Sequence, residues 1–333
     1  MIDYSLSRGV KNILVVRLGA MGDIIHALPA VASLKRSFPG AHITWVAESP
    51  WVPLLEGNGL VDRVVPFYRR LPRTWNRTRN ELRTRPYDLA IDFQGLIKSA
   101  LVAHFAGPER IVGFRPGIVR ERPASWFYST RVDTKSVHVV DQALDLAAAA
   151  GAASPLGGRT ALTFLVPPGA PEGKLPAQPF VLACPLAGWT SKQWPLEHYE
   201  TLARMIQERL GVALVFNGAP GSLAKLPLED SRWILRHESG IPGLIDATRR
   251  AAFVIGVDSG PMHLAAALNK SGVAIFGPTD PARNGPRGGD FRVFRVAGAQ
   301  TTHQRGATID PSMRAISPEE VFAAVAIGVS CHA

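Results

Sequence analysis

The stretch "ILVVRLGAMGDIIHALPAVASL", from Ile13 to Leu34, decides the fold class. A short apolar run passes through a glycine turn into a helical pattern, which is typical of the opening unit of a parallel α/β sheet. Such a turn usually offers backbone N–H groups to a phosphate. Here an anion, Asp23, stands where the phosphate would lie, and the question is what a carboxylate does there.

The same alternation of strand and helix continues along the chain, for example from "HITWVAE" (42–48) to "DLAIDFQ" (88–94). A Gly- and Pro-rich stretch at about 152–179 predicts a linker, and "FVLACPL" (180–186) begins a second series. We therefore expect an α/β protein with two doubly wound, Rossmann-like domains facing across a cleft, residues 1–165 and 166–333. Packing of the C-terminal helix back on the first domain is left open. Open sheets of this kind bind ligands at the carboxyl ends of their strands.

Charge is distributed unevenly along the chain. Residues 1–170 hold 21 Lys+Arg against 13 Asp+Glu, a net charge of +8, whereas residues 171–333 hold 16 against 14. A basic half suits an anionic partner such as nucleic acid, a membrane surface or a phosphorylated substrate, or serves solubility alone. Two cysteines define neither a disulfide framework nor a zinc pattern. Without a signal-peptide pattern or a membrane-spanning window, we expect a cytoplasmic protein that can still touch a membrane surface.

The turn at Gly19–Asp23 is the first candidate site. Its spacing, G-x-x-G-D, differs from the dinucleotide fingerprint G-x-G-x-x-G, which disfavours a nicotinamide enzyme. One interpretation of Asp23 is a helix N-cap with no further role. The other is a general base, because a helix N-terminus stabilises a carboxylate by about 0.3–1 kcal/mol.

Three further loops follow strands of the second half. In "GWTSKQWP" (188–195), N–H, hydroxyl and ammonium donors can hold a pyrophosphate. In "GVDSGPMHLAAAL" (256–268), a carboxylate at a strand end precedes a turn and a histidine in the first turn of a helix. "GPTDPARNGP" (277–286) combines turn residues with a hydroxyl. Each also has a plain structural interpretation as a polar loop. The candidate donor-binding residues are Thr190, Ser191, Lys192, Asp258, Ser259, Gly260, His263 and Thr279.

The stretch "RRLPRTWNRTRNELRTRP" (69–86) carries seven arginines against one acid, Glu81. It predicts a solvated basic helix, or a clamp for phosphates and anionic headgroups, since the planar guanidinium binds such anions through two bonds. RNA binding is a less favoured interpretation, because Trp75 is the only aromatic residue in this stretch.

Together, "VVRLGAMGDIIHALPA", "GWTSKQWP", "VDSGPMHLAAAL" and "GPTDPARNGP" resemble the ADP-heptose lipopolysaccharide heptosyltransferases, glycosyltransferase family 9. Their order and spacing cover nearly the whole chain. "DFQGLIKSAL", "RERPASWFYSTRV" and "HVVDQALDLAAAAG" are similar to heptosyltransferase I rather than II.

The resemblance implies a GT-B fold and an inverting transfer of L-glycero-D-manno-heptose from ADP-heptose to the Kdo of Kdo2–lipid A, at the cytoplasmic face of the inner membrane. It implies no cofactor and no essential metal. Asp23 matches the catalytic base, Lys192 a diphosphate contact, Asp258 a donor-heptose contact, and His263 with the 259–260 turn a phosphate site. The acceptor side is assigned to Gly22, Arg69, Arg70, Arg73, Lys98 and Arg120.

Two departures from the family pattern bear on the donor. Ala187 and Gly188 stand where the family has a hydroxyl pair, and Ser222 and Leu223 follow the "NGAPG" strand end in place of an acid that holds the ribose. The rival functions are a family 9 transferase with another acceptor or nucleotide sugar, and a protein that binds anionic membranes or nucleic acid through Arg69–Arg85. We expect a membrane partner and no nucleic acid.

Overall fold

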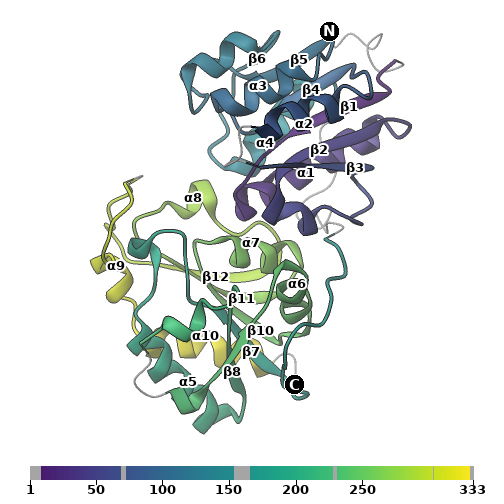
Figure 1. The fold of residues 1–333 in the computed structure, drawn as a ribbon. Coiled ribbons are helices and arrows are strands. Elements are labelled where there is room, and N and C mark those ends of the chain that lie inside the picture. Colours follow the sequence, from purple (N-terminus) through teal and green to yellow (C-terminus); the bar gives the residue numbers. More distant parts are fainter. Residues whose placement is uncertain (1–8, 69–72, 154–165, 228–230, 303, 331–333) are drawn as a thin grey trace. The chain divides into compact units, whose positions relative to one another are not determined.

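The computed structural model describes residues 9–68, 73–153, 166–227, 231–302 and 304–330. The chain divides into two compact units, Met1–Pro167 and Pro168–Ala333. Each unit holds one six-stranded sheet in which all the strand pairs are parallel, with helices between the strands (Figure 1). Arg69 and Arg70 lie outside the described residues, and so do residues 154–165 of the predicted linker.

The first unit has the sheet order β3-β2-β1-β4-β5-β6. The order reverses between β1 and β4, so the carboxyl ends of these two strands form the switch point at which open sheets bind ligands. Its elements in chain order are β1 (Asn12–Val16), α1 (Met21–Ser37), β2 (His42–Glu48), the 3-10 helix η2 (Ser49–Leu54), β3 (Arg63–Phe67), α2 (Arg73–Leu82), β4 (Leu89–Asp92), α3 (Ile97–Phe105), β5 (Arg110–Phe114), the 3-10 helix η3 (Arg122–Phe127), β6 (Thr130–Val132) and α4 (Val139–Ala149).

The second unit repeats this plan with the order β12-β11-β10-β7-β8-β9, and its switch point lies between β7 and β10. Its elements are β7 (Phe180–Cys184), the 3-10 helix η5 (Thr190–Lys192), α5 (Leu196–Leu210), β8 (Ala213–Gly218), the 3-10 helices η6 (Leu223–Lys225) and η7 (Ser231–Trp233), β9 (Ile234–Glu238), α6 (Ile241–Arg250), β10 (Phe253–Val257), α7 (Gly260–Ala267), β11 (Ser271–Phe276), α8 (Pro281–Asn284), β12 (Asp290–Arg295), α9 (Pro311–Arg314) and α10 (Pro318–Ser330).

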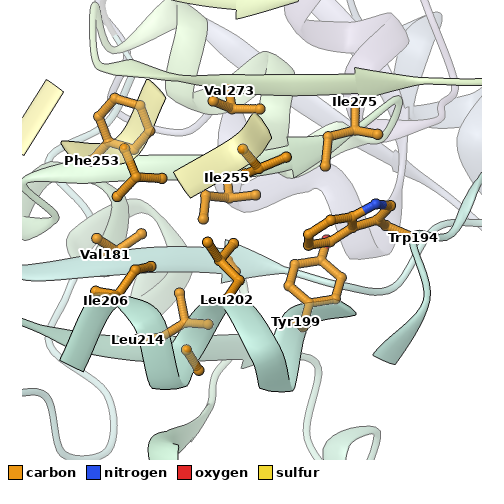
Figure 2. Close-up of a cluster of buried hydrophobic side chains, with 14 of the residues drawn as sticks. Val181, Trp194, Tyr199, Leu202, Ile206, Leu214, Phe253, Ile255, Val273 and Ile275 are labelled. Carbon is orange, nitrogen blue, oxygen red and sulfur yellow. The ribbon is translucent and has the colours of Figure 1, made fainter. Parts of the chain in front are cut away.

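Alternate residues of β7 feed two separate cores. Val181 and Ala183 join the cluster under α5 and α10 (Figure 2), whereas Phe180 and Leu182 pack with residues of α6 and α7 on the other face. A strand buried on both faces must be apolar throughout, which explains the continuous run "FVLAC". The C-terminal helix α10 packs on α5, β10 and β11 of the second unit.

Candidate active site

Asp23 lies in the first turn of α1, directly after the turn that follows β1. The N-cap of α1 is Ala20, which has no side-chain acceptor, and Asp23 Oδ2 accepts a hydrogen bond from the Ala20 N–H at 3.2 Å. The N-cap interpretation of Asp23 is therefore wrong, because the carboxylate reaches back to the cap from the third helical position. The Asp23 side chain is 35% exposed, which leaves it accessible to a second molecule.

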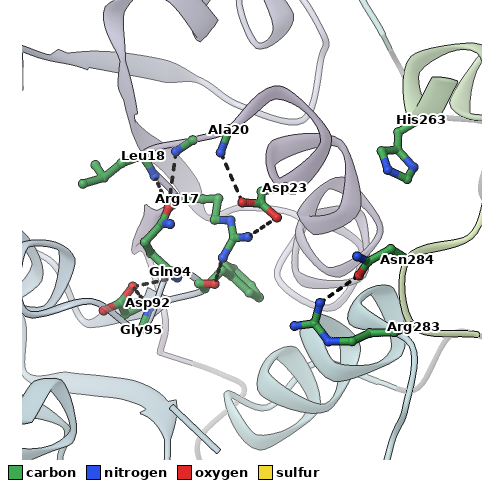
Figure 3. Close-up of polar contacts among 12 residues, drawn as sticks. Arg17, Leu18, Ala20, Asp23, Asp92, Gln94, Gly95, His263, Arg283 and Asn284 are labelled. Atoms are coloured by element: carbon green, nitrogen blue, oxygen red, sulfur yellow. Dashed lines mark hydrogen bonds and ion pairs between the residues drawn. The ribbon is translucent and has the colours of Figure 1, made fainter. Parts of the chain in front are cut away.

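Arg17, at the end of β1, is the cation that faces Asp23. Its Nη2 lies 2.7 Å from Asp23 Oδ1, and its Nη1 donates to the Phe93 carbonyl (Figure 3). Arg17 is only 13% exposed, so the guanidinium is held between α1 and the end of β4. Arg17 is absent from the site residues predicted above, although a basic residue between a buried strand and a glycine turn is a signal that could have indicated it.

Gln94 ties the end of β4 to the turn that carries Asp23. Its Oε1 accepts hydrogen bonds from the Leu18 N–H at 3.1 Å and the Gly19 N–H at 3.3 Å (Figure 3). A glycine is required at position 19, because a Cβ there would lie 2.8 Å from Nε1 of Trp51. The turn is therefore fixed from two sides by residues distant in sequence.

Asp92 fixes the backbone of the loop that carries Gln94. Its Oδ1 accepts from the N–H groups of Gln94 and Gly95 at 2.8 and 3.2 Å, and its Oδ2 accepts from Ser99 Oγ at 2.8 Å and Tyr128 Oη at 2.7 Å. The carboxyl is completely buried, and this burial raises its pKa although the hydrogen bonds oppose the shift. Asp92 is thus a structural group that shapes the loop, inaccessible to substrate.

The structure brings part of the predicted acceptor set to the same edge of the sheet. Lys98, in the first turn of α3, pairs with Glu48 at the end of β2, with 3.0 Å between Nζ and Oε1. Gly22 is the second residue of α1, and the exposed Arg120 lies in the loop after β5, where its backbone N–H neighbours Gly95. Arg73 begins α2, but its side chain, like Arg69 and Arg70, lies outside the described part of the chain.

In the second unit, Lys192, Asp258 and His263 form one cluster at the carboxyl ends of β7 and β10. Lys192 Nζ lies 2.6 Å from Asp258 Oδ2, and His263 Nε2 lies 3.5 Å from Asp258 Oδ1. Burial disfavours the charged form of Asp258, but the His263 hydrogen bond and the Lys192 charge outweigh it and hold the pKa well below its usual range. Asp258 is therefore an anion that orients two groups able to bind a phosphate.

Three hydroxyls of this edge are buried and have no hydrogen-bond partner among the described residues. They belong to Ser191 of η5, Ser259 at the N-cap of α7, and Thr279 after β11. A buried hydroxyl without a protein partner has its donor and acceptor available to a bound molecule, and three of them gather at this edge of the sheet. Thr190 is exposed in η5, and Gly260 begins α7. The structure thus groups the predicted donor residues.

Two charged residues near this edge are absent from the predicted set. The Arg305 guanidinium lies 5.7 Å from the ring centre of Trp189, and Lys192 Nζ lies 4.3 Å from the same ring. Glu238, at the end of β9, accepts the N–H groups of Gly221 and Leu223 at 2.8 Å each, and so supports the loop after β8. Both contacts join segments distant in sequence, and no local pattern signals them.

Within the described ranges, no group of three or more His, Cys, Asp or Glu side chains is arranged to hold a metal ion. The helices of the described chain include none that is both long and apolar enough to span a membrane.

The family model of glycosyltransferase family 9 (heptosyltransferase) matches residues 75–310. The chain belongs to glycosyltransferase family 9. It is 30% identical over 311 residues to lipopolysaccharide heptosyltransferase 1 of Escherichia coli strain K12, covering 86% of this chain and 93% of that protein. Lipopolysaccharide heptosyltransferase 1 of Pseudomonas aeruginosa is 29% identical over 303 residues, 83% of this chain and 81% of the relative.

A comparison with solved structures finds heptosyltransferases with the same fold. E. coli heptosyltransferase WaaC with ADP superposes with a TM-score of 0.77 at 25% identity, covering 95% of this chain and 99% of that one. The prediction of a GT-B glycosyltransferase with two Rossmann-like domains is therefore confirmed. Lipopolysaccharide heptosyltransferase 2 of E. coli K12 matches at a lower identity, 26% over 344 residues. This agrees with the three sequence stretches that are more similar to heptosyltransferase I than to II.

Proposed function

We propose that this family 9 transferase moves L-glycero-D-manno-heptose from ADP-heptose to the Kdo of Kdo2–lipid A, in the building of the lipopolysaccharide inner core. The main evidence for the ADP-heptose donor is the cluster of Lys192, Asp258 and His263, which lies beside three buried hydroxyls that have no partner among the described residues. These groups supply an ammonium, a ring N–H and hydroxyl donors, which suit a diphosphate. The similarity to a heptosyltransferase solved with ADP supports the same donor class.

Asp23 is the base of the proposed reaction. Its carboxylate accepts the proton of the acceptor hydroxyl while that oxygen attacks the anomeric carbon of the heptose. The bond from this carbon to the diphosphate oxygen breaks on the opposite side, so the configuration inverts. Arg17 and the Ala20 N–H hold the two carboxylate oxygens and thereby fix the direction in which Asp23 meets the hydroxyl.

The leaving ADP gathers negative charge as its bond to the sugar breaks. Lys192 and His263 stabilise this charge where it forms, and the positive end of the α7 dipole at Gly260 adds to their effect. The proposal includes no cofactor and no essential metal. On the acceptor side, Lys98 and Arg120, together with Arg69, Arg70 and Arg73, are the groups assigned to the anionic groups of the Kdo acceptor.

The deciding experiment is mass spectrometry of the product made from ADP-heptose and Kdo2–lipid A. The proposal expects a product heavier by one heptosyl unit, and no such product in the absence of either substrate. Transfer only to an acceptor that already carries one heptose would instead indicate the heptosyltransferase II-like alternative. Transfer from another nucleotide sugar alone would refute the donor assignment.

A rival of a different class is a binding protein that uses Arg69–Arg85 on membranes or nucleic acid. Thermal stabilisation by ADP, UDP, NAD and a short RNA, compared side by side, separates it from the transferase. We expect ADP to raise the unfolding temperature more than RNA does, because the donor cluster suits a diphosphate and lies in the second unit, whereas Arg69–Arg85 belong to the first. A larger shift with RNA than with ADP would favour the rival.

A further inference from the structure

The side-chain amide of Gln94 is held through its oxygen, while its nitrogen donates to none of the residues that the structure describes. Oε1 accepts from the Leu18 and Gly19 N–H groups, and the backbone N–H of Gln94 donates to Asp92 Oδ1 at 2.8 Å. Because both groups of the turn are donors, only the amide oxygen can face them, and Nε2 lies on the other side of the amide. The residue is 6% exposed, so the two N–H groups of Nε2 have a fixed direction.

Asn58 is a second buried amide of the first unit and provides a comparison. Its Oδ1 also accepts two backbone N–H groups, those of Leu60 at 2.9 Å and Val61 at 3.1 Å, and the residue is 1% exposed. Its Nδ2 is completely enclosed, whereas Nε2 of Gln94 keeps contact with the surface. Both amides fix a turn, but that of Gln94 also offers its N–H groups to a molecule from outside.

Gln94 and Asp23 bind neighbouring N–H groups of one turn. Gln94 accepts from the groups at positions 18 and 19, and Asp23 Oδ2 accepts from that of Ala20. Arg17 links the same two segments, since its guanidinium pairs with Asp23 and donates to the carbonyl just before Gln94 (Figure 3). The N–H groups of Nε2 are therefore at the same turn as the 35% exposed carboxylate proposed as the base.

The chemistry of an amide nitrogen defines the partner that it needs. Nε2 only donates, and an ionised carboxylate only accepts, so the two are complementary. A hydrogen bond to an ionised group is also shorter and stronger than one between neutral groups. Two cations of this edge are already engaged by carboxylates of the chain, Arg17 by Asp23 and Lys98 by Glu48. The Gln94 amide adds donors that no described carboxylate occupies.

We propose that Nε2 of Gln94 binds the carboxylate of the acceptor sugar and thereby directs the reacting hydroxyl to Asp23. The inference rests on the proposed function, in which the acceptor Kdo is a sugar acid. An amide that the fold already holds in place loses little side-chain entropy on binding. Because the amide is neutral, it holds the acceptor without adding a cation beside the base, which would weaken the base as a proton acceptor. Gln94 is then a substrate-binding residue that selects a sugar acid over a neutral sugar.

Gln94→Glu tests this contact with few other changes. One Glu oxygen can accept the same two N–H groups, and the other replaces Nε2 by an anion that repels a carboxylate. The measurement is steady-state kinetics of the full chain with ADP-heptose and Kdo2–lipid A at about pH 8, where the new carboxyl is ionised. We expect the KM for the acceptor to rise about 10- to 100-fold, with kcat lowered only a few-fold and the Kd of ADP unchanged. Gln94→Met also loses the oxygen that holds the turn, so it should lower kcat as well.

Asn58→Asp is the matched control, because it makes the same chemical change at an amide outside the acceptor edge. Its KM for the acceptor should equal that of the parent, and thermal unfolding of both variants measures the structural cost of each change. A second acceptor identifies the group that Nε2 binds, namely a Kdo analogue with a hydroxymethyl group in place of the carboxylate. For the parent, the analogue should raise KM about tenfold or more, and Gln94→Glu should add no more than a few-fold to that value.

An unchanged acceptor KM in Gln94→Glu would overturn the contact and leave Gln94 as a structural residue of the turn. An equally large rise on the neutral analogue would overturn it too, since Nε2 would then meet another group of the acceptor. An equal rise in Asn58→Asp would mean a general loss of structure and would also refute the assignment. All three results leave transfer by the parent intact. Absence of transfer by the parent itself would refute the proposed function, and with it the acceptor assigned to Gln94.

Discussion

Asp23→Asn tests whether Asp23 is the catalytic base, because the expected loss of turnover is much larger than the expected loss of stability. Asn keeps the shape of Asp but offers one acceptor oxygen, so it satisfies either Arg17 or the Ala20 N–H. The lost bond costs at most about 1 kcal/mol, since the Asp23 side chain is 35% exposed and the ion pair is screened by solvent. For a domain of this size, that loss lowers the unfolding temperature by about 2–4 °C.

The loss of the base is much larger. A positioned general base contributes about 10²–10⁴ to the rate, which corresponds to about 3–5 kcal/mol in the activation barrier. We expect kcat of Asp23→Asn to fall by that factor at saturating substrates, with the Kd of ADP unchanged, because Asp23 and the donor cluster lie in different units. Initial rates, calorimetric titration with ADP and thermal unfolding measure the three quantities.

Asp62→Asn is the matched control. Asp62 also pairs with a cation, Lys35 at 2.9 Å, accepts a backbone N–H, that of Ile43 at 2.7 Å, and is 37% exposed. Both partners of Asp62 bind Oδ2, so an Asn oxygen in that place keeps both contacts and only the charge of the ion pair is lost. Asp62→Asn should therefore lose no more stability than Asp23→Asn and should retain kcat. If Asp23→Asn turned over within a few-fold of the parent, Asp23 would be a structural residue and the mechanism given above would be wrong.

The other predictions concern the donor cluster and the arginine stretch. Lys192→Ala and His263→Ala should both raise the Kd of ADP and lower turnover, because both groups meet the diphosphate before and during bond breaking; an unaltered Kd in both variants would place the donor elsewhere. The depressed pKa of Asp258 stabilises the fold above the ordinary value of 3.8, and this stability is lost as the pH falls through the folded-state pKa. Urea unfolding between about pH 2 and 5 should therefore show a steeper acid loss for the parent than for Asp258→Asn, and parallel curves would contradict it. Replacing three or four arginines of Arg69–Arg85 should raise the KM for the acceptor and flatten its salt dependence, whereas an equal loss of donor affinity would indicate misfolding.

The sequence predicts the fold well where burial dictates the residue type. β7 and β10 are buried on both faces and are apolar throughout, so the amino-acid pattern alone locates them. β6, β9 and β12 were not predicted, because they carry exposed, charged residues at or near the sheet edges, as in "DFRVFR". Only pairing with a neighbouring strand makes them β structure. The sequence patterns at 51–58 and around Ser222 favour helices, and the structure forms short 3-10 helices there, at Ser49–Leu54 and Leu223–Lys225.

In the candidate site, residues with a local sequence signal are predictable, and those positioned by distant contacts are not. Asp23, Lys192, Asp258 and His263 each follow a buried strand closely, and that local signal made them predictable. Arg17 has a local signal, because it stands between the strand and the glycine turn six residues from Asp23, but its contact with the Phe93 carbonyl joins positions 76 residues apart. Gln94 has no such local signal, because its contacts with the 18–19 turn span 75 and 76 residues. The motifs predicted Lys192 and Asp258 in one site, but their pairing at 2.6 Å depends on the adjacency of β7 and β10.

The hydrogen bonds of the two turns explain why the opening stretch carries a carboxylate where a phosphate usually binds. After β1, the N–H groups of Leu18 and Gly19 are taken by Gln94, and that of Ala20 by Asp23 itself. A turn whose donors are satisfied within the chain has little to offer a phosphate, and the carboxylate it does hold is accessible and oriented by Arg17. After β10, the Ser259 hydroxyl remains without a partner among the described residues. Under the proposed function, the same strand–turn–helix unit serves a base in one domain and a diphosphate in the other, according to which of its donors the fold has already satisfied.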